Sequence, residues 1–269
     1  MTAGVRPPPD DPDHLDRADL VMVGDQDDAL LSAVGAVAAA RGARAVRTDR
    51  GAVARHLTVE FDGERATTSP RMPLLLRMES PASAATDRFA AAEAHAHVWA
   101  AAALMDAPVV NRPSSLRGSD WPPRLYIPLL LGTAGFDRKH LHDETYASTP
   151  PEPAGDYQTQ ALTPSGARSP VRHAVRYRHR RTMLAGHRRV VIAGEHHWVS
   201  PGGPEGDELA RRSVEVASAI GLTLCSVTWV RAAGPGTMKL AKVTGHPHAA
   251  GLGELVGPVA RALLDHLLR

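Results

Sequence analysis

Residues 19–48, DLVMVGDQDDALLSAVGAVAAARGARAVRT, decide the fold class of this chain. The first five, DLVMV, predict a short apolar strand that ends at Gly24. Residues 25–41 then carry apolar side chains at helical spacing as far as Gly42, a residue type that is common just after helices. Residues 43–48 return to a strand pattern. A strand, a helix and a strand in this order indicate an α/β domain.

The segment that follows extends the same unit. Residues 57–68, LTVEFDGERATT, have Asp-Gly at their centre and predict a β-hairpin. Residues 74–78 predict a buried strand, and residues 87–105 predict a long Ala-rich helix that is closed by the short segment APVVNRP. We therefore expect one N-terminal α/β domain over residues 19–118.

Charge, cysteine content and hydropathy exclude several classes of protein. Lys and Arg total 31 against 29 acidic residues, so no strong field points to nucleic acid or to a membrane surface. Cys225 is the single cysteine, which excludes an internal disulfide and a cysteine-built metal cluster, and its apolar surroundings predict a buried structural thiol. Residues 1–18 lack the apolar core of a secretion signal and are expected to form a flexible leader. With no bilayer-length apolar run, we expect a soluble cytoplasmic protein, which could form a homodimer.

The second half of the chain is less regular. Residues 143–170 are rich in proline and poor in apolar residues, which predicts an irregular crossing segment. Residues 176–194, RYRHRRTMLAGHRRVVIAG, predict two strands around a turn at residues 185–187. Further elements are expected in this order: an amphipathic helix over 205–220, strands over 222–231 and 238–244, and a terminal helix over 255–269.

Two stretches carry a resemblance to a known family. Residues 108–136, PVVNRPSSLRGSDWPPRLYIPLLLGTAGF, resemble the W-V-N-x-P…S-K-x-x-x-L…A-G-F signature of the ATP-grasp superfamily. Asn111, Pro113 and Ser119 carry that match, and Arg124 stands in place of the lysine. The chain is most similar to the ribosomal-peptide maturases and the glutathione-synthetase-like ligases of that superfamily.

The second stretch, residues 179–194, resembles the V-R-V-x-V-V-G-x-x-V-F-A hairpin of the same family. The resemblance puts Arg181 on the family's substrate-side arginine and Gly186 on its turn. It implies an ATP-grasp-like α/β fold in which residues 19–118 form the pre-grasp domain. Residues 119–170 would then be a connection that replaces the ATP-clamping subdomain, and residues 171–269 a truncated C-terminal grasp domain.

The departures from the family fall on its metal ligands. The resemblance implies an Asp on one strand, where GLTLCSVTW places Thr228, and a Glu and an Asn on the next. There, MKLAKVTGHPHAAG, residues 238–251, places Lys242 and Thr244. Magnesium needs hard oxygen ligands, and a lysine ammonium would repel it. The chain is therefore not expected to use Mg-ATP.

Histidines supply a positive signal at the same place. His246 and His248 follow the last strand, within the former nucleotide cleft of the resemblance. Neutral imidazole can ligate a metal ion or a haem iron, or act as a general base. The alternative is a loop whose two histidines face water.

Basic residues could complete such a cleft. Arg189 closes a stretch rich in Arg and His, and a guanidinium binds planar anions such as carboxylates, phosphates or haem propionates with two hydrogen bonds. A solvated strand face is the alternative. We thus select His246, His248, Lys242 and Arg189 as candidate cofactor-binding residues, the two histidines as candidate metal ligands, and Arg181 and Thr228 as candidate catalytic residues.

Three functions remain open from the sequence. The first is a repurposed ATP-grasp-fold enzyme, an oxidoreductase of specialised metabolism that holds non-covalent haem and acts on an amino-acid-like small molecule. The second is a pseudoenzyme that binds a peptide or a partner protein without catalysis. The third is a residual ATP-dependent carboxylate-amine ligase, which the missing acidic residues disfavour.

Overall fold

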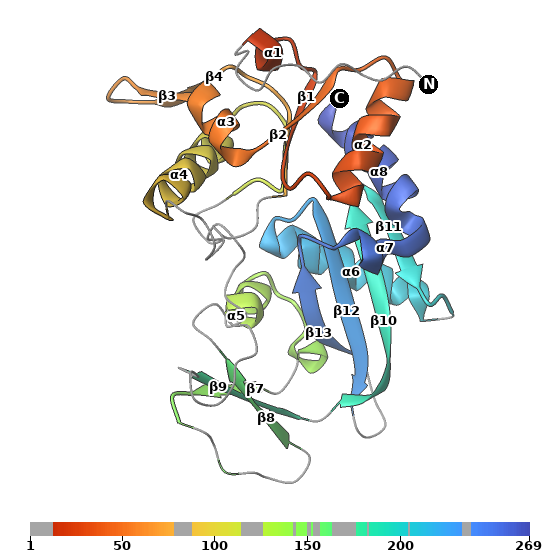
Figure 1. Cartoon of the computed structure of the whole chain (residues 1–269). Coiled ribbons are helices and arrows are strands. Elements are labelled where there is room, and N and C mark those ends of the chain that lie inside the picture. Colours follow the sequence, from red (N-terminus) through yellow and green to blue (C-terminus); the bar gives the residue numbers. More distant parts are fainter. Residues whose placement is uncertain are drawn as a thin grey trace. The chain divides into compact units, whose positions relative to one another are not determined.

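The computed structural model describes residues 13–77, 88–113, 126–141, 144–149, 152, 157–162, 176–181, 183–203, 205–232 and 238–269 (Figure 1). Its contacts divide the chain into two compact units. Unit 1 comprises residues 1–120, 193–195 and 246–269, and unit 2 comprises residues 121–192 and 196–245. Each unit combines helices with sheets, so the mixed α/β class expected from the sequence is confirmed.

Unit 1 is built around a parallel sheet with the strand order β2-β1-β5-β6. The hairpin of β3 and β4 is antiparallel, as residues 57–68 predict. The elements of unit 1, in chain order, are α1 (Asp13–Asp16), β1 (Leu20–Val23), α2 (Ala29–Ala40), β2 (Ala45–Thr48), α3 (Arg50–His56), β3 (Thr58–Phe61), β4 (Ala66–Ser69), β5 (Leu74–Leu76), α4 (Arg88–Leu104), β6 (Val109–Val110), α7 (Ala249–Leu252), η3 (Gly253–Leu255) and α8 (Val256–Leu267).

Alternate residues of β1 face opposite sides of this sheet. Val21 and Val23 pack into one apolar cluster with Val53 of α3 and Val98 of α4. Met22 faces the other side, toward α2, where a Cβ added to Gly35 would lie 3.4 Å from its Cε. Both faces of the sheet are therefore covered by helices, as is usual for parallel sheets.

The C-terminal segment returns to unit 1, which differs from the expected single domain over residues 171–269. Helix α8 packs along α2, and the Arg41 guanidinium at the end of α2 pairs with Asp265 of α8. Buried side chains of α8, Val259 and Leu263 among them, supply the apolar surface for this packing. Residues 246–269 therefore belong with the N-terminal domain.

The N-terminal leader expected over residues 1–18 lies outside the described residues up to residue 12. Beyond it, α1 forms a short helix, and Leu15 is buried in the same cluster as Val21. The last part of the segment is therefore packed rather than flexible. Ser119 and Arg124, which carried part of the family resemblance, also lie outside the described residues.

Unit 2 contains two sheets, one with the order β11-β10-β12-β13 and a smaller one with the order β7-β9-β8. Helix α6 ends at Gly221, whose φ of 71° gives the left-handed conformation that glycine adopts without strain. The elements of unit 2, in chain order, are α5 (Tyr126–Thr133), η1 (Arg138–His140), β7 (Glu144–Ala147), β8 (Tyr157–Leu162), β9 (Arg176–Arg181), β10 (Met183–Ala193), β11 (His196–Ser200), α6 (Gly206–Ile220), β12 (Leu224–Ala232) and β13 (Met238–Thr244).

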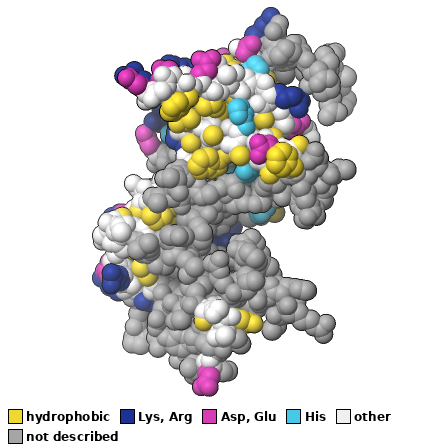
Figure 2. Space-filling view, turned by 90° about the vertical axis from the view of Figure 1, so that its left-hand side faces the viewer, with side chains coloured by type: hydrophobic (Ala, Val, Ile, Leu, Met, Phe, Trp, Pro, Cys, Tyr) yellow, Lys and Arg dark blue, Asp and Glu magenta, His cyan; other side chains and the backbone are white. Residues whose placement is uncertain are grey.

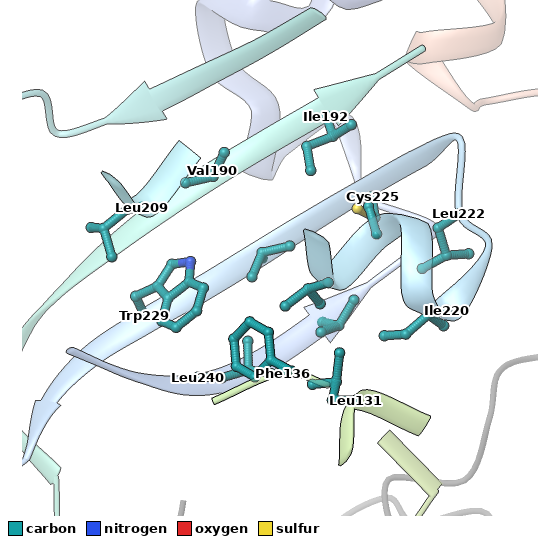
Figure 3. Close-up of a cluster of buried hydrophobic side chains, with 14 of the residues drawn as sticks. Leu131, Phe136, Val190, Ile192, Leu209, Ile220, Leu222, Cys225, Trp229 and Leu240 are labelled. Carbon is teal, nitrogen blue, oxygen red and sulfur yellow. The ribbon is translucent and has the colours of Figure 1, made fainter. Parts of the chain in front are cut away.

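One face of the larger sheet forms the core of unit 2 (Figure 3). Trp229 is fully buried there, and its indole N–H donates a hydrogen bond of 2.8 Å to the buried Ser213 hydroxyl. Cys225 is buried in the same cluster, as expected, and burial raises the pKa of its thiol to about 12. The cysteine is thus an unreactive core residue.

The smaller sheet corrects the irregular segment expected over residues 143–170. β7 and β8 both lie in that segment, and each pairs antiparallel with β9. Their polar residues, as in YQTQAL of β8, lack the apolar alternation that would have indicated strands. The segment therefore contributes to a folded sheet as well as to a connection.

The turn expected at residues 185–187 is also wrong. β10 continues through Gly186 to Ala193, and the turn lies at Gly194 and Glu195, between β10 and β11. Both Gly186 and Gly194 have a positive φ, 96° and 59°, so either position is compatible with a glycine-dependent turn. The sequence pattern therefore identified a hairpin but placed it eight residues too early.

Candidate functional site

Thr228 and Lys242 lie directly opposite each other on the antiparallel pair β12 and β13, and Ser226 lies opposite Thr244. The neighbouring residues Cys225, Val227, Trp229 and Val243 point into the core of unit 2. Because side chains alternate across a strand, the two polar pairs share the opposite face of the sheet. We call this surface the polar face.

A β-bulge adjusts the register beside this pair. The register shifts between Thr228 and Trp229, whose partners are Lys242 and Leu240, so Ala241 is the extra residue. The extra residue allows both Leu240 and Val243 to face the core although they are three positions apart. It also keeps Lys242 on the polar face, where its side chain is exposed and Thr228 is half-buried.

Arg189 of β10 belongs to the same face. β10 lies next to β12 in the sheet, and Val190 and Ile192 of β10 point into the core. Arg189 directly precedes the core residue Val190, so its side chain points to the polar side of the sheet. It is half-buried. The polar face thus places a guanidinium, a hydroxyl and an ammonium group on three adjacent strands.

The new position of the turn changes the match to the family hairpin. The family motif places its substrate-side arginine five residues before the glycine of the turn. With Gly194 on the turn, the arginine at that spacing is Arg189 rather than Arg181. Arg181 instead ends β9, where it pairs with Tyr157 of β8 in the smaller sheet.

The donor set of the larger sheet does not suit a magnesium ion. Its four strands, LCSVTWVRA, MKLAKVT, MLAGHRRVVIA and HHWVS, contain no Asp or Glu. Protein sites for Mg²⁺ use carboxylate oxygens, and the exposed ammonium of Lys242 opposes a cation. Among the described residues, no group of three His, Cys, Asp or Glu side chains is placed to hold a metal ion.

His246 and His248 belong to unit 1, beside the carboxyl ends of β1 and β5. The strand order reverses between these two strands, which is the position where open parallel sheets usually bind ligands. In this protein, an ion pair occupies that position between the two strands. The Arg77 guanidinium, almost fully buried, binds the Asp28 carboxylate through Nε and donates from Nη2 to the Pro247 carbonyl at 3.1 Å.

Asp28 also begins α2. Its Oδ1 accepts hydrogen bonds from the backbone N–H groups of Leu30 at 2.8 Å and Leu31 at 3.2 Å. Burial works to raise the pKa of the Asp28 carboxyl, but the hydrogen bond and charge of Arg77 and the two backbone bonds outweigh it, and the pKa is lowered. The carboxylate therefore stays charged and holds Arg77 in place.

The two histidines differ in their surroundings. Burial, helped by the charge of Arg77, lowers the pKa of His246 to about 4, so its imidazole is neutral near pH 7. His248 is exposed and precedes α7. His246 is half-buried, whereas His248 is exposed. Ligation of haem by either histidine stays a prediction.

The six residues selected from the sequence are divided between the units. Arg181, Arg189, Thr228 and Lys242 belong to unit 2, and His246 and His248 to unit 1. Within unit 2, the polar face combines Arg189, Thr228 and Lys242, whereas Arg181 lies in the other sheet. Sequence reasoning missed Arg77 and Asp28. A charged residue directly after the apolar run LLL, and an Asp before ALL, were the available signals.

No known family model and no curated protein matches this sequence. Solved structures, in contrast, match its fold. The ATP-grasp ligase PsnB complexed with a minimal precursor superposes with a TM-score of 0.66 at 14% identity, covering 93% of this chain and 99% of that chain. The macrocyclase MdnC from Microcystis aeruginosa MRC, bound to the precursor peptide MdnA, gives 0.65 at 11% identity with the same coverage.

A third solved structure shows the same similarity. The RimK domain ATP-grasp protein from Sphaerobacter thermophilus gives a TM-score of 0.59 at 14% identity, again over 93% of this chain and 99% of that chain. The chain therefore has the ATP-grasp fold, which confirms the fold expected from the sequence. None of the described helices combines the length and apolar character that a bilayer crossing needs.

Proposed function

We propose that this protein uses its ATP-grasp fold to bind an acidic peptide on the polar face and does not carry out Mg-ATP-dependent ligation. The observation that carries the proposal is the cross-strand pair of Thr228 and Lys242. The family resemblance assigns metal-binding acids to both positions. A hydroxyl and an ammonium there reverse the electrostatic preference of the site from cations to anions.

Three basic side chains support a preference for carboxylates. Lys242 is exposed on the polar face, Arg189 lies on the same face, and Lys239 precedes Leu240 on the same strand. The four strands of the sheet carry no acidic residue that would repel a carboxylate. A guanidinium binds a carboxylate through two parallel hydrogen bonds, and an ammonium adds a point charge.

A peptide fits this surface better than the amino-acid-like small molecule expected from the sequence. The solved PsnB and MdnC structures contain precursor peptides, and their fold covers nearly the whole of this chain. A peptide with several carboxylates could contact Arg189 and Lys242 together. Association should then weaken with salt, since exposed charges are screened over about 10 Å at 0.1 M ionic strength.

The test compares two charge reversals. A fluorescein-labelled peptide of alternating Glu and Ala is titrated with the wild-type protein, with Lys242→Glu and with Lys139→Glu, and fluorescence anisotropy gives the dissociation constant. Lys139 is the matched control because it is an exposed lysine of the same unit, paired with Asp137 at 2.7 Å. Lys242→Glu is expected to weaken binding by about tenfold or more. Lys139→Glu should change it little.

Two results would contradict the proposal. Equal affinity for a Lys-Ala peptide would remove the preference for acidic partners, and equal weakening by both variants would remove the polar face as its origin. Thermal stabilisation of the wild-type protein by ATP that requires Mg²⁺ would instead support the ligase hypothesis, because a ligand that binds only the folded state raises its stability. An absorption spectrum of the purified protein separately tests the haem prediction.

A further inference from the structure

Helix α4 of unit 1 presents a largely apolar side to solvent. Its opposite side supplies Val98, Ala101 and Ala102 to the apolar cluster of unit 1, where all three are fully buried. The solvent side begins at Phe89, which is 76% exposed, and ends near Leu104, which is 43% exposed. Figure 2 shows this side of unit 1, where hydrophobic side chains gather on the surface. The proposed function makes no use of this surface.

The residues of this surface follow one line along the helix. Phe89, Ala92 and Ala96 are exposed, and the half-buried Ala100 and Ala103 continue the line toward the C-terminal end of α4. Residues three and four positions apart lie on the same side of a helix, and these residues recur at such intervals. The line contains no Lys or Arg. It therefore consists of one large aromatic side chain followed by alanines.

The alanines restrict what can cover this surface. A contiguous apolar patch marks an interaction site more often than a single exposed apolar residue does, because covering it removes apolar area from water. Helices that lie on membranes combine several large apolar residues with Lys and Arg, and the line on α4 offers Phe89 alone. Alanine side chains instead allow a second helix to approach closely. The surface therefore suits another helix that has a large side chain to place over alanine.

A second copy of α4 supplies such a helix. In an antiparallel pair with a two-fold axis at Ala96, Phe89 of one copy lies opposite Ala103 of the other, at both ends of the pair. The large side chain of each copy thus meets a small one. Glu93 falls opposite Trp99 of the other copy, so like charges do not face each other. The surface is therefore self-complementary, as a two-fold interface requires.

We propose that α4 forms the interface of a homodimer, in which the line from Phe89 to Ala103 packs antiparallel against the same line of a second copy. The helix of 17 residues is about 25 Å long, so the interface is small and the dimer dissociates at low protein concentration. The interface shares no residue with the polar face and does not rest on the proposed peptide binding.

Sedimentation velocity of the full chain, at concentrations from about 1 to 100 µM, tests the proposal. The wild type is expected to dimerise with a Kd on the order of 10 µM, in the weak range that suits a small interface. Ala96→Arg places two guanidinium groups on the axis and should weaken dimerisation by about tenfold or more. Ala90→Arg is the matched control, because Ala90 is exposed on the same helix but lies about 120° around it from Ala96.

A second pair of variants separates this interface from general adhesion of exposed aromatic side chains. Phe89→Ser should weaken dimerisation. Phe61→Ser should not, although Phe61, at the end of β3, is 74% exposed and loses the same apolar area. Thermal unfolding checks that all four variants keep a Tm close to that of the wild type, as expected for exposed positions.

A disulfide reports the position of the two-fold axis. Ala96→Cys adds one exposed thiol on the axis, while the native Cys225 is buried, so mild oxidation should cross-link two copies. Ala90→Cys should stay uncross-linked. The proposal is overturned by a wild type that is monomeric at about 100 µM, by equal weakening in Ala90→Arg and Ala96→Arg, or by equal cross-linking of the two cysteine variants.

Discussion

The parallel sheet of unit 1 is apolar on both faces, whereas the antiparallel sheet of unit 2 carries Arg189, Thr228 and Lys242 on the face opposite its main core, beside buried residues such as Val191 and Val230. The difference follows from connectivity, because parallel strands need helical crossovers that cover the sheet. At the carboxyl end of the unit 1 sheet, Arg77 is enclosed and paired with Asp28. Substitutions in unit 1 should therefore change stability, and substitutions on the polar face should change ligand binding.

The largest effect is expected for Asp28→Ala in unit 1. The substitution leaves the buried Arg77 guanidinium without its counter-charge and removes the cap of α2. Breaking a buried pair from one side typically costs about 3–5 kcal/mol. Urea unfolding measures the loss. Asp265→Ala, which breaks the exposed pair with Arg41, should cost about 1 kcal/mol or less. Similar losses for both variants would show that burial does not distinguish the two pairs.

Acid should destabilise the protein through His95 and His246. The pKa values of His95 and His246 are lowered from 6.5 to about 4, so the unfolded state binds more protons than the folded state between these values. Stability is therefore retained above about pH 6.5 and falls as the pH drops toward 4. The loss is up to about 3 kcal/mol for each residue. Urea unfolding at pH 7 and pH 5 should show a smaller difference for His95→Gln than for the wild type.

The smallest change in stability is expected for a variant designed to gain Mg-ATP binding on the polar face. Thr228→Asp, Lys242→Glu and Thr244→Asn together install the metal ligands that the family resemblance assigns to these positions. Mg-ATP at a hundred times its Kd would stabilise this variant by about 2.7 kcal/mol. Thermal unfolding with ATP and Mg²⁺, with ATP and EDTA as the control, measures the gain. A wild-type protein that responds as strongly would remove the contrast between the two sheets.

The sequence predicted regular segments well and charge-rich segments poorly. Residues 87–105 predict a helix and α4 spans Arg88–Leu104, because a long Ala-rich segment has few competing conformations. β9, RYRHRR, was predicted as a strand, but its partners β7 and β8 were missed, because a polar strand such as β8, YQTQAL, shows no apolar alternation and its pairing depends on distant segments. The turn at Gly194 was misplaced because Gly186 offers the same local signal. The local sequence pattern could not decide which of the two glycines forms the turn.

The candidate site shows the same division. Thr228 and Lys242 were each selected from the sequence as candidate site residues. Their cross-strand pairing follows from the register of the two predicted strands that carry them. The position of His246 could not be inferred, because no local pattern indicates that residues 246–269 rejoin unit 1. Its neighbours Arg77 and Asp28 are more than 150 residues away along the chain, as the contact between Arg77 and Pro247, 170 positions apart, illustrates.

The return of α8 to unit 1 has a consequence for synthesis on the ribosome. Residues 121–245, which contain unit 2, leave the ribosome before α8 does, although domains usually complete their folding from the N-terminus onward. Until Val256–Leu267 emerges, the side of α2 that α8 covers has no partner. Unit 1, whose strands are made first, is thus completed only after the whole of unit 2 has been made, and until then the nascent chain carries the uncovered side of α2.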